Sequence, residues 1–271
     1  MKYLCGWLGV SRSGYYDWLK RPQSERVKED AQLSRRIETI YQSSRGTYGS
    51  PRVFKTLKNQ GEAVGRKRVE RLMREKGLQG RVVKVTRRCP GLKRFVARGE
   101  NLRLNGPSPS SINQVWASDV TYLKVNGQWR YLATVMDVFS RRILGWSLDE
   151  NRSVDLSLTA LRNALRDRLP GKELIFHTDR GIEYTSHRFR RELRRYNIRP
   201  SVNRPGCCTD NAHMESFFHT LKAELIRGNV FHSDLGLRYA LNDYISHFYN
   251  HRRLHSGIGY LAPAKFEAMA A

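Results

Sequence analysis

The stretch of residues 115–138, VWASDVTYLKVNGQWRYLATVMDV, decides the fold. Apolar and polar residues alternate roughly over Val115–Val125 and again over Gln128–Val138, which is the period of a β-strand. Between the two runs stands Asn126-Gly127, the strongest short signal for a two-residue hairpin turn. We therefore predict two long antiparallel strands joined by a tight turn.

The rest of the C-terminal half alternates between short strands and amphipathic helices. Further strands are predicted at Arg142–Asp149, Leu174–His177 and Ile198–Val202. Helices are predicted at Ser153–Leu169, His187–Tyr196, Asp210–Ile226 and Asp234–Tyr249. This order predicts an α/β fold in which helices flank a mixed five-stranded sheet. In such a sheet the first and fourth strands lie side by side.

A different, all-α pattern precedes the strands. Helices are predicted at Asp30–Gln42, after Ser50-Pro51, and at Gly65–Lys76. Two short helices joined by a glycine turn predict a helix-turn-helix-like region over about residues 30–80, within a helical region of residues 1–96. The second helix is crowded with cations that a DNA-recognition helix would use: Arg66, Lys67, Arg68 and Arg71. A small helical bundle with a solvated basic face is the alternative.

The segment 97–111, ARGENLRLNGPSPSS, is rich in Gly, Pro, Ser and Asn and is predicted to be a linker. Charge is distributed unevenly around it. The 271 residues include 49 Lys/Arg and 25 Asp/Glu, a net charge of +24. Residues 1–110 hold 26 Lys/Arg and 9 Asp/Glu, so they account for +17 of it. This excess indicates a polyanionic partner, with nucleic acid the first candidate.

Composition also argues against several classes of protein. Hydrophobic residues make up 39% of the chain and aromatic residues 10%, too many for a wholly disordered tail. The sequence has no run of about 18 apolar residues, so no membrane span is predicted. The four cysteines form no CxxC pair, which argues against a zinc ribbon or a disulfide scaffold and fits a reducing cytoplasm.

Three carboxylates are placed where chemistry would need them. Asp119 lies within a strand, Asp179 just past the end of another, and Glu215 in the first turns of a helix. Residues between them number 59 and 35. If the first and fourth strands are neighbours and a helix crosses their ends, the three acids meet at one edge of the sheet. Such a trio could bind two Mg²⁺ ions for phosphoryl transfer at a DNA backbone.

Several segments, in order and at this spacing, resemble one family. WASDVTYL, FHTDRGIEYTS and CTDNAHMESFFHTLKAEL are similar to the DDE core of retroviral integrases and bacterial transposases. The closing run YNHRRLHSGIGYLAPAKF, together with SRSGYYDW and YGSPRVFKTL upstream, resembles the OrfB-type transposase of copy-and-paste bacterial insertion sequences. The resemblance covers nearly the whole chain. It implies a ribonuclease H-like catalytic core over residues 112–271 with a C-terminal helical extension.

The resemblance also implies the chemistry. Asp119, Asp179 and Glu215 would bind two Mg²⁺ or Mn²⁺ ions, and the enzyme would cleave and transfer strands at the ends of an element. Lys222, two helical turns after Glu215, would contact DNA, and so would Arg252 and Arg253. Expected partners are double-stranded DNA, at least a second copy of the chain, and an upstream-frame helix-turn-helix protein made as a frameshift fusion. We expect a cytoplasmic, nucleoid-associated protein.

Other residues near these motifs have more than one interpretation. His177 and Asn211 are candidates to support the acidic residues, although a strand-end histidine is often merely satisfied in the core. We interpret Glu183 as a solvent-facing acid, Glu224 as a helix-surface acid, and Asp137 as a structural acid paired with Arg141 or Arg142. Two rival functions remain: another nuclease or integrase on the same fold, and a non-enzymatic DNA-binding regulator.

Overall fold

The structure is a computed structural model that describes residues 1–81, 99–104, 106–171 and 173–270. They form two compact units, Met1–Gly80 and Arg81–Ala271, which are described separately. Residues 82–96 of the predicted helical region, and 97, 98 and 105 of the predicted linker, lie outside the described residues. The predicted domain boundaries stay a prediction. No helix in the described part of the chain is long and apolar enough to span a membrane.

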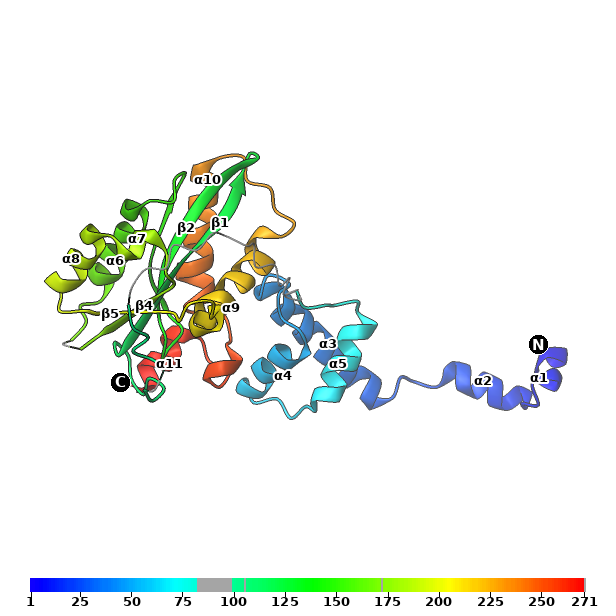
Figure 1. Cartoon of the computed structure of the whole chain (residues 1–271). Coiled ribbons are helices and arrows are strands. Elements are labelled where there is room, and N and C mark those ends of the chain that lie inside the picture. The colour runs from blue at the N-terminus through cyan, green and yellow to red at the C-terminus, as the bar shows by residue number, and fades with distance from the viewer. Residues whose placement is uncertain (82–98, 105, 172, 271) are drawn as a thin grey trace. The chain divides into compact units, whose positions relative to one another are not determined.

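The first unit contains five helices in its described residues: α1 (Lys2–Trp7), α2 (Arg12–Lys20), α3 (Glu25–Ser43), α4 (Ser50–Asn59) and α5 (Arg66–Glu75) (Figure 1). The last three surround fully buried side chains, among them Ile37, Leu57 and Val69. Helix α3 begins five residues before the predicted start because Ser24 caps it, its Oγ accepting from the Val27 amide. The α3–α5 unit is therefore helix-turn-helix-like, as predicted.

The second unit is built on a five-stranded mixed sheet with the order β3-β2-β1-β4-β5. Its strands are β1 (Val115–Val125), β2 (Gln128–Asp137), β3 (Ile143–Asp149), β4 (Ile175–Thr178) and β5 (Arg199–Val202). The first three pair antiparallel, whereas β4 pairs parallel with both β1 and β5. Asn126 and Gly127 take φ values of 46° and 80° at the predicted hairpin turn. The sequence-based prediction of the sheet is thus confirmed.

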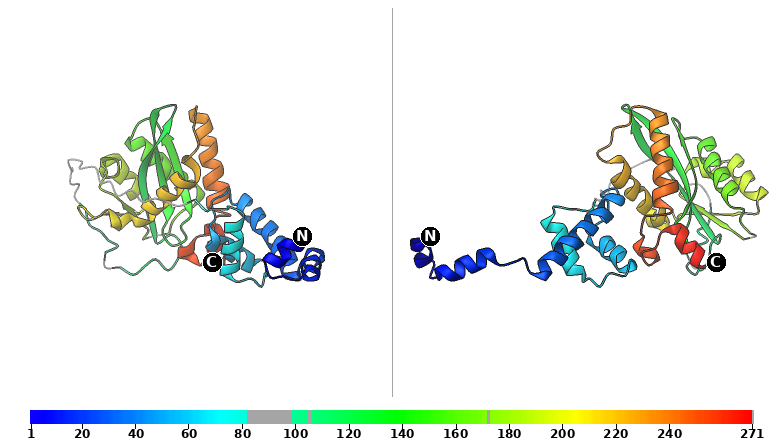
Figure 2. Two further views of the ribbon diagram at one scale, coloured as in Figure 1. Left: turned by 90° about the vertical axis from the view of Figure 1, so that its right-hand side faces the viewer. Right: turned by 180° about the vertical axis from the view of Figure 1, so that it is seen from behind.

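One face of the sheet is covered by α6 (Val154–Asp167) and α8 (His187–Arg195), with the short α7 (Ile182–Thr185) beside them (Figures 1 and 2). Trp116 and Phe176 of the sheet and Leu161 and Phe189 of the helices belong to one buried core. Helix α6 lies very close to β3 at Gly145: a Cβ on this residue would come within 2.4 Å of backbone atoms of α6. That glycine permits the approach.

The opposite face carries the C-terminal helices (Figure 2). A 3₁₀ turn (Cys208–Asn211) leads into α9 (Ala212–Leu221), which continues as a π-helical turn over Lys222–Ile226. Helix α10 (Asp234–Asn242) likewise continues as a π-helical segment, Asp243–Tyr249, and α11 (Pro263–Ala270) follows. The two long helices predicted here are present, but each changes its hydrogen-bonding period toward its C-terminal end.

Candidate active site

The parallel pairing of β1 and β4 brings the first two predicted acids together. Ser118 lies opposite Thr178 in the register, Asp119 is the next residue on β1, and Asp179 is the first residue after β4. The Val120 amide donates to Asp119 Oδ1 at 2.7 Å, and the Gly181 amide donates to Asp179 Oδ1 at 3.0 Å. Both carboxylates are half-buried. The topology therefore places a carboxylate pair at the carboxyl end of β4, where α/β sheets bind ligands.

The electrostatics of this pair show that the two groups interact. Burial, and next the negative charge of Asp179, raise the pKa of Asp119 to about 8. Burial also raises the pKa of the Asp179 carboxyl. Ionising both carboxylates of this pair costs free energy because their charges repel, and a divalent cation would relieve that cost. Hard carboxylate oxygens are the ligands that Mg²⁺ prefers, so the donor set fits such an ion.

The third predicted acid, Glu215, lies on α9. The Asn211 side-chain amide donates to the Ser118 carbonyl oxygen at 3.1 Å and so anchors the start of α9 beside Asp119. Glu215 follows one turn later, and its side chain is exposed. Within the described ranges, no three Asp, Glu, His or Cys side chains gather closely enough to hold a metal ion. The structure thus joins Asp119 and Asp179, while Glu215 is near the same end but outside their cluster.

Lys222 lies on the same side as these acids. Its ammonium sits 4.5 Å from the ring centroid of Tyr122, which is three residues beyond Asp119 on β1. Burial lowers the pKa of Lys222, and the charge of Asp119 acts in the opposite direction. Tyr122 is 54% exposed, so the pair borders solvent. Tyr122 was not predicted from the sequence, and nothing in the local pattern distinguishes it from other strand aromatics.

An ion pair that the sequence did not predict lies beside Asp179. Arg152, in the loop between β3 and α6, donates from Nε and Nη2 to Glu183 Oε1 at 2.9 and 2.7 Å. Its Nη2 is also 3.8 Å from Asp179 Oδ2. The side chain of Glu183 is only 6% exposed. The interpretation of Glu183 as a solvent-facing acid is therefore wrong. The sequence did not reveal the pairing because Arg152 lies 31 residues earlier in the chain.

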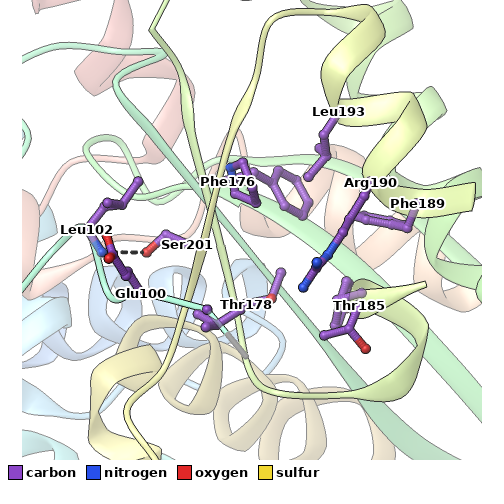
Figure 3. A pocket seen from close by; sticks show the side chains of 13 residues that line it. Glu100, Leu102, Phe176, Thr178, Thr185, Phe189, Arg190, Leu193 and Ser201 are labelled. Carbon is purple, nitrogen blue, oxygen red and sulfur yellow. Dashed lines mark hydrogen bonds between the residues drawn. The ribbon is translucent and has the colours of Figure 1, made fainter. Parts of the chain in front are cut away.

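His177 is fully buried and turns toward the edge strand. Its Nδ1 shares a hydrogen bond of 2.9 Å with Ser201 Oγ on β5. Burial, with a smaller effect of the Arg103 charge, lowers the pKa of His177 to about 4, so the imidazole is neutral at pH 7. Ser201 Oγ also accepts from the Leu102 amide (Figure 3). His177 thus ties β4 to β5.

A cavity of about 250 Å³ lies between α8 and the strands β4 and β5 (Figure 3). Its walls include Phe176, Phe189, Leu193 and Arg190. None of the three acids lines it. It is therefore separate from the candidate active site.

The predicted DNA contacts other than Lys222 fall into three groups. Arg66, Lys67 and Arg252 are exposed. Arg68 and Arg71 both bind the Asp30 carboxylate at 2.6 Å, so α5 is tied to α3 by its own cations. Arg253 is buried, with 4% exposure.

The surroundings of the Arg253 side chain contradict the prediction that it contacts DNA. Its Nη2 and Nε donate to the buried carboxylate of Glu224 at 2.8 and 2.9 Å. Tyr244 donates a further hydrogen bond to Glu224 at 2.7 Å. Glu224 is therefore a core residue rather than a helix-surface acid. Asp137 is structural, but its ion-pair partner is Arg168 at 3.6 Å.

Comparison with known proteins agrees with this arrangement. Integrase core domain families match residues 109–208 and 196–263, and an HTH-like domain family matches residues 28–85. Transposase InsF for insertion sequence IS3A of Escherichia coli K12 is 37% identical, over 98% of this chain and 93% of that protein. A 31 kDa protein of insertion element IS600 from Shigella sonnei is 35% identical, over 97% of both.

A solved structure shares the fold at low identity. The simian T-cell lymphotropic virus intasome, in complex with a PP2A regulatory subunit, contains a chain 15% identical with a TM-score of 0.51. That match covers 85% of this chain and 74% of the other. The 37% identity to InsF extends over nearly the full length of the chain, and both the HTH-like domain and the integrase core are matched. This chain therefore belongs to the IS3 family of transposases, which are DDE polynucleotidyl transferases.

Proposed function

We propose that Asp119, Asp179 and Glu215 form the active site of this transposase and together bind two divalent ions, Mg²⁺ or Mn²⁺. The observation that carries the proposal is the parallel pairing of β1 and β4, which sets Asp119 beside Asp179. When bound, the ions supply Lewis-acid activation of the attacking and leaving oxygens of an in-line displacement. The protein's own contribution is to hold the carboxylates and to orient the DNA strand.

Glu215 joins the pair from α9 in this proposal. Asn211 fixes the start of that helix on β1, and Glu215 lies one turn away on an exposed position. In the proposal, Glu215 approaches the pair by a change of side-chain rotamer, with the helix kept intact. His177 and Asn211 act as supports, one tying β4 to β5 and the other tying α9 to β1.

Lys222 and the basic helices hold DNA. The Lys222 ammonium, placed over Tyr122 at the border of the site, would contact a phosphate near the reacting end. Arg66 and Lys67 on α5 and Arg252 after the last helical segment are exposed and would neutralise further phosphates. Arg68 and Arg71 are already paired with Asp30, and with Glu29 and Glu75 respectively, so DNA would have to compete with these acids for them.

The reaction that this site would perform has two steps. Hydrolysis at an end of the element frees a 3′-hydroxyl, and that hydroxyl then attacks another phosphodiester, so no covalent protein–DNA intermediate is needed. We infer that the first transfer joins one end of the element to the other, and that a circular form then integrates. Two ends must be held at once, which favours a homodimer or larger assembly on DNA. An upstream-frame fusion partner would add end recognition.

The test replaces each acid by its amide in the full-length chain. Asp119→Asn, Asp179→Asn and Glu215→Gln should each lower strand cleavage of a duplex carrying the element's end by at least about a hundredfold, more than loss of a residue that only orients a metal ligand. Binding of the same duplex, measured by gel shift without divalent ions, should remain. Asp155→Asn, which removes an exposed acid paired with Arg188, is the matched control and should cleave normally. Cleavage by Glu215→Gln at the wild-type rate would contradict the role of Glu215.

A further inference from the structure

Arg152 makes two unequal contacts with acids. Two of its nitrogens donate to Glu183 Oε1 at hydrogen-bond distance. Its Nη2 lies 3.8 Å from Asp179 Oδ2, which is a charge contact but too long for a hydrogen bond. The guanidinium is thus fixed on Glu183 and only near Asp179.

Glu183 is itself held firmly enough to fix the Arg152 guanidinium. The carboxylate is 6% exposed, and a buried carboxylate is stable only when paired. It also lies against the backbone of the loop that carries Asp179. A Cβ on Gly181 would fall 2.7 Å from Glu183 Oε1, and the Gly181 amide is the group that donates to Asp179. Glu183 therefore touches both the cation and the loop that orients the acid.

The charges of this cluster are unbalanced before any ion binds. Asp119, Asp179 and Glu183 influence one another as like charges. Arg152 opposes them and is the cation in contact with Asp179, while Lys222 adds a positive charge near Asp119. We propose that Arg152 is a positioning residue, the resident counter-ion of the Asp119–Asp179 pair before a divalent ion binds. Glu183 holds its guanidinium out of hydrogen-bond contact with Asp179 and so leaves that carboxylate free for the ion. This inference rests on the metal site proposed above.

The proposal predicts that removing Arg152 has opposite effects on stability and on ion binding. Arg152→Gln takes away the counter-ion, so the metal-free protein should unfold at a lower temperature. The same change removes a competitor of the divalent ion, so ion affinity should rise by about three- to tenfold. A residue that only supported the structure would, when removed, weaken stability and ion binding together.

Glu183→Gln should act in the other direction. Without the charged partner, Arg152 can close onto Asp179, and ion affinity should fall by about three- to tenfold. In the Arg152→Gln background the same change should have little effect, because the guanidinium that it releases is gone. If Glu183 instead acted through its own charge alone, the loss would be equal in both backgrounds. The double variant also places two neutral amides in contact, which guards against misfolding of the single variant.

The experiment titrates Mn²⁺ into each full-length protein and follows the free-ion electron paramagnetic resonance signal, with thermal unfolding measured without and with the ion. Arg162→Gln removes an exposed arginine paired with Glu192 and is the matched control, expected to bind Mn²⁺ as the wild type does. Asp119→Asn should lose the specific site. If Asp119→Asn binds normally, the metal site itself is wrong. If that variant loses binding but Arg152→Gln fails to gain affinity, only the role of Arg152 is overturned.

Discussion

At the scale of single residues, Gly181 shows how little space surrounds the acids. Its amide orients Asp179, while its α-carbon faces the carboxylate of Glu183 at a distance that leaves no room for a methyl group. Glu183 is pinned by Arg152 and is not free to swing away. A small change here should therefore alter the site more than the stability of the fold.

Gly181→Ala tests this expectation. The new methyl group should push the Glu183 carboxylate and shift Asp179, so strand cleavage should fall by about ten- to a hundredfold, as ångström-scale misplacement of reacting groups does. Thermal unfolding should change little beside that. Gly257→Ala, where a Cβ would meet nothing within 4 Å, is the control and should retain full cleavage. Equal activity of the two variants would contradict the role given to Gly181.

At the scale of elements, the C-terminal segments are joined to the sheet and to α9 by buried polar groups. Asn250 uses its side-chain amide like a strand, bonding both the N–H and the C=O of Ile143 on the edge strand β3. Glu224, on the π-helical turn after α9, binds Arg253 and Tyr244. These contacts hold α9, and with it Glu215, in place on the sheet.

Arg253→Met should destabilise the protein by about 3–5 kcal/mol, because it leaves the Glu224 carboxylate buried without its partner. Urea unfolding measures this loss. Adding Glu224→Gln should restore part of it, since a neutral amide costs less to bury than an unpaired charge. A DNA-contact role would predict instead a normal urea midpoint with weakened DNA binding.

At the scale of the whole molecule, both units are basic. Residues 1–80 hold 18 Lys/Arg and 8 Asp/Glu, and residues 81–271, which include the acids of the candidate site, hold 31 and 17. The exposed cations of α5 can therefore hold DNA through phosphates. The second unit has to bring an acidic site to the same polyanion, which divalent ions make possible.

The exposed cations of α5 predict how DNA binding depends on salt. Arg66→Gln and Lys67→Gln should each reduce the slope of log affinity against log salt concentration by about one, because each removes one phosphate contact. Gel shifts at several salt concentrations measure the slope. Lys28→Gln, which removes an exposed α3 lysine paired with Glu25, should leave the slope unchanged. An unaltered slope in both α5 variants would place the DNA contact elsewhere.

The sequence by itself determined the hairpin, the succession of strands and helices along the chain, and the helix pair, because alternation, glycine turns and helix caps act over a few neighbouring residues. It also determined the transposase family, through motifs read in order. Only the tertiary structure decided the partners of Glu183, Glu224 and Arg253. Those ion pairs join residues about 30 positions apart, and a periodicity states which way a side chain faces along its own element but not what packs there.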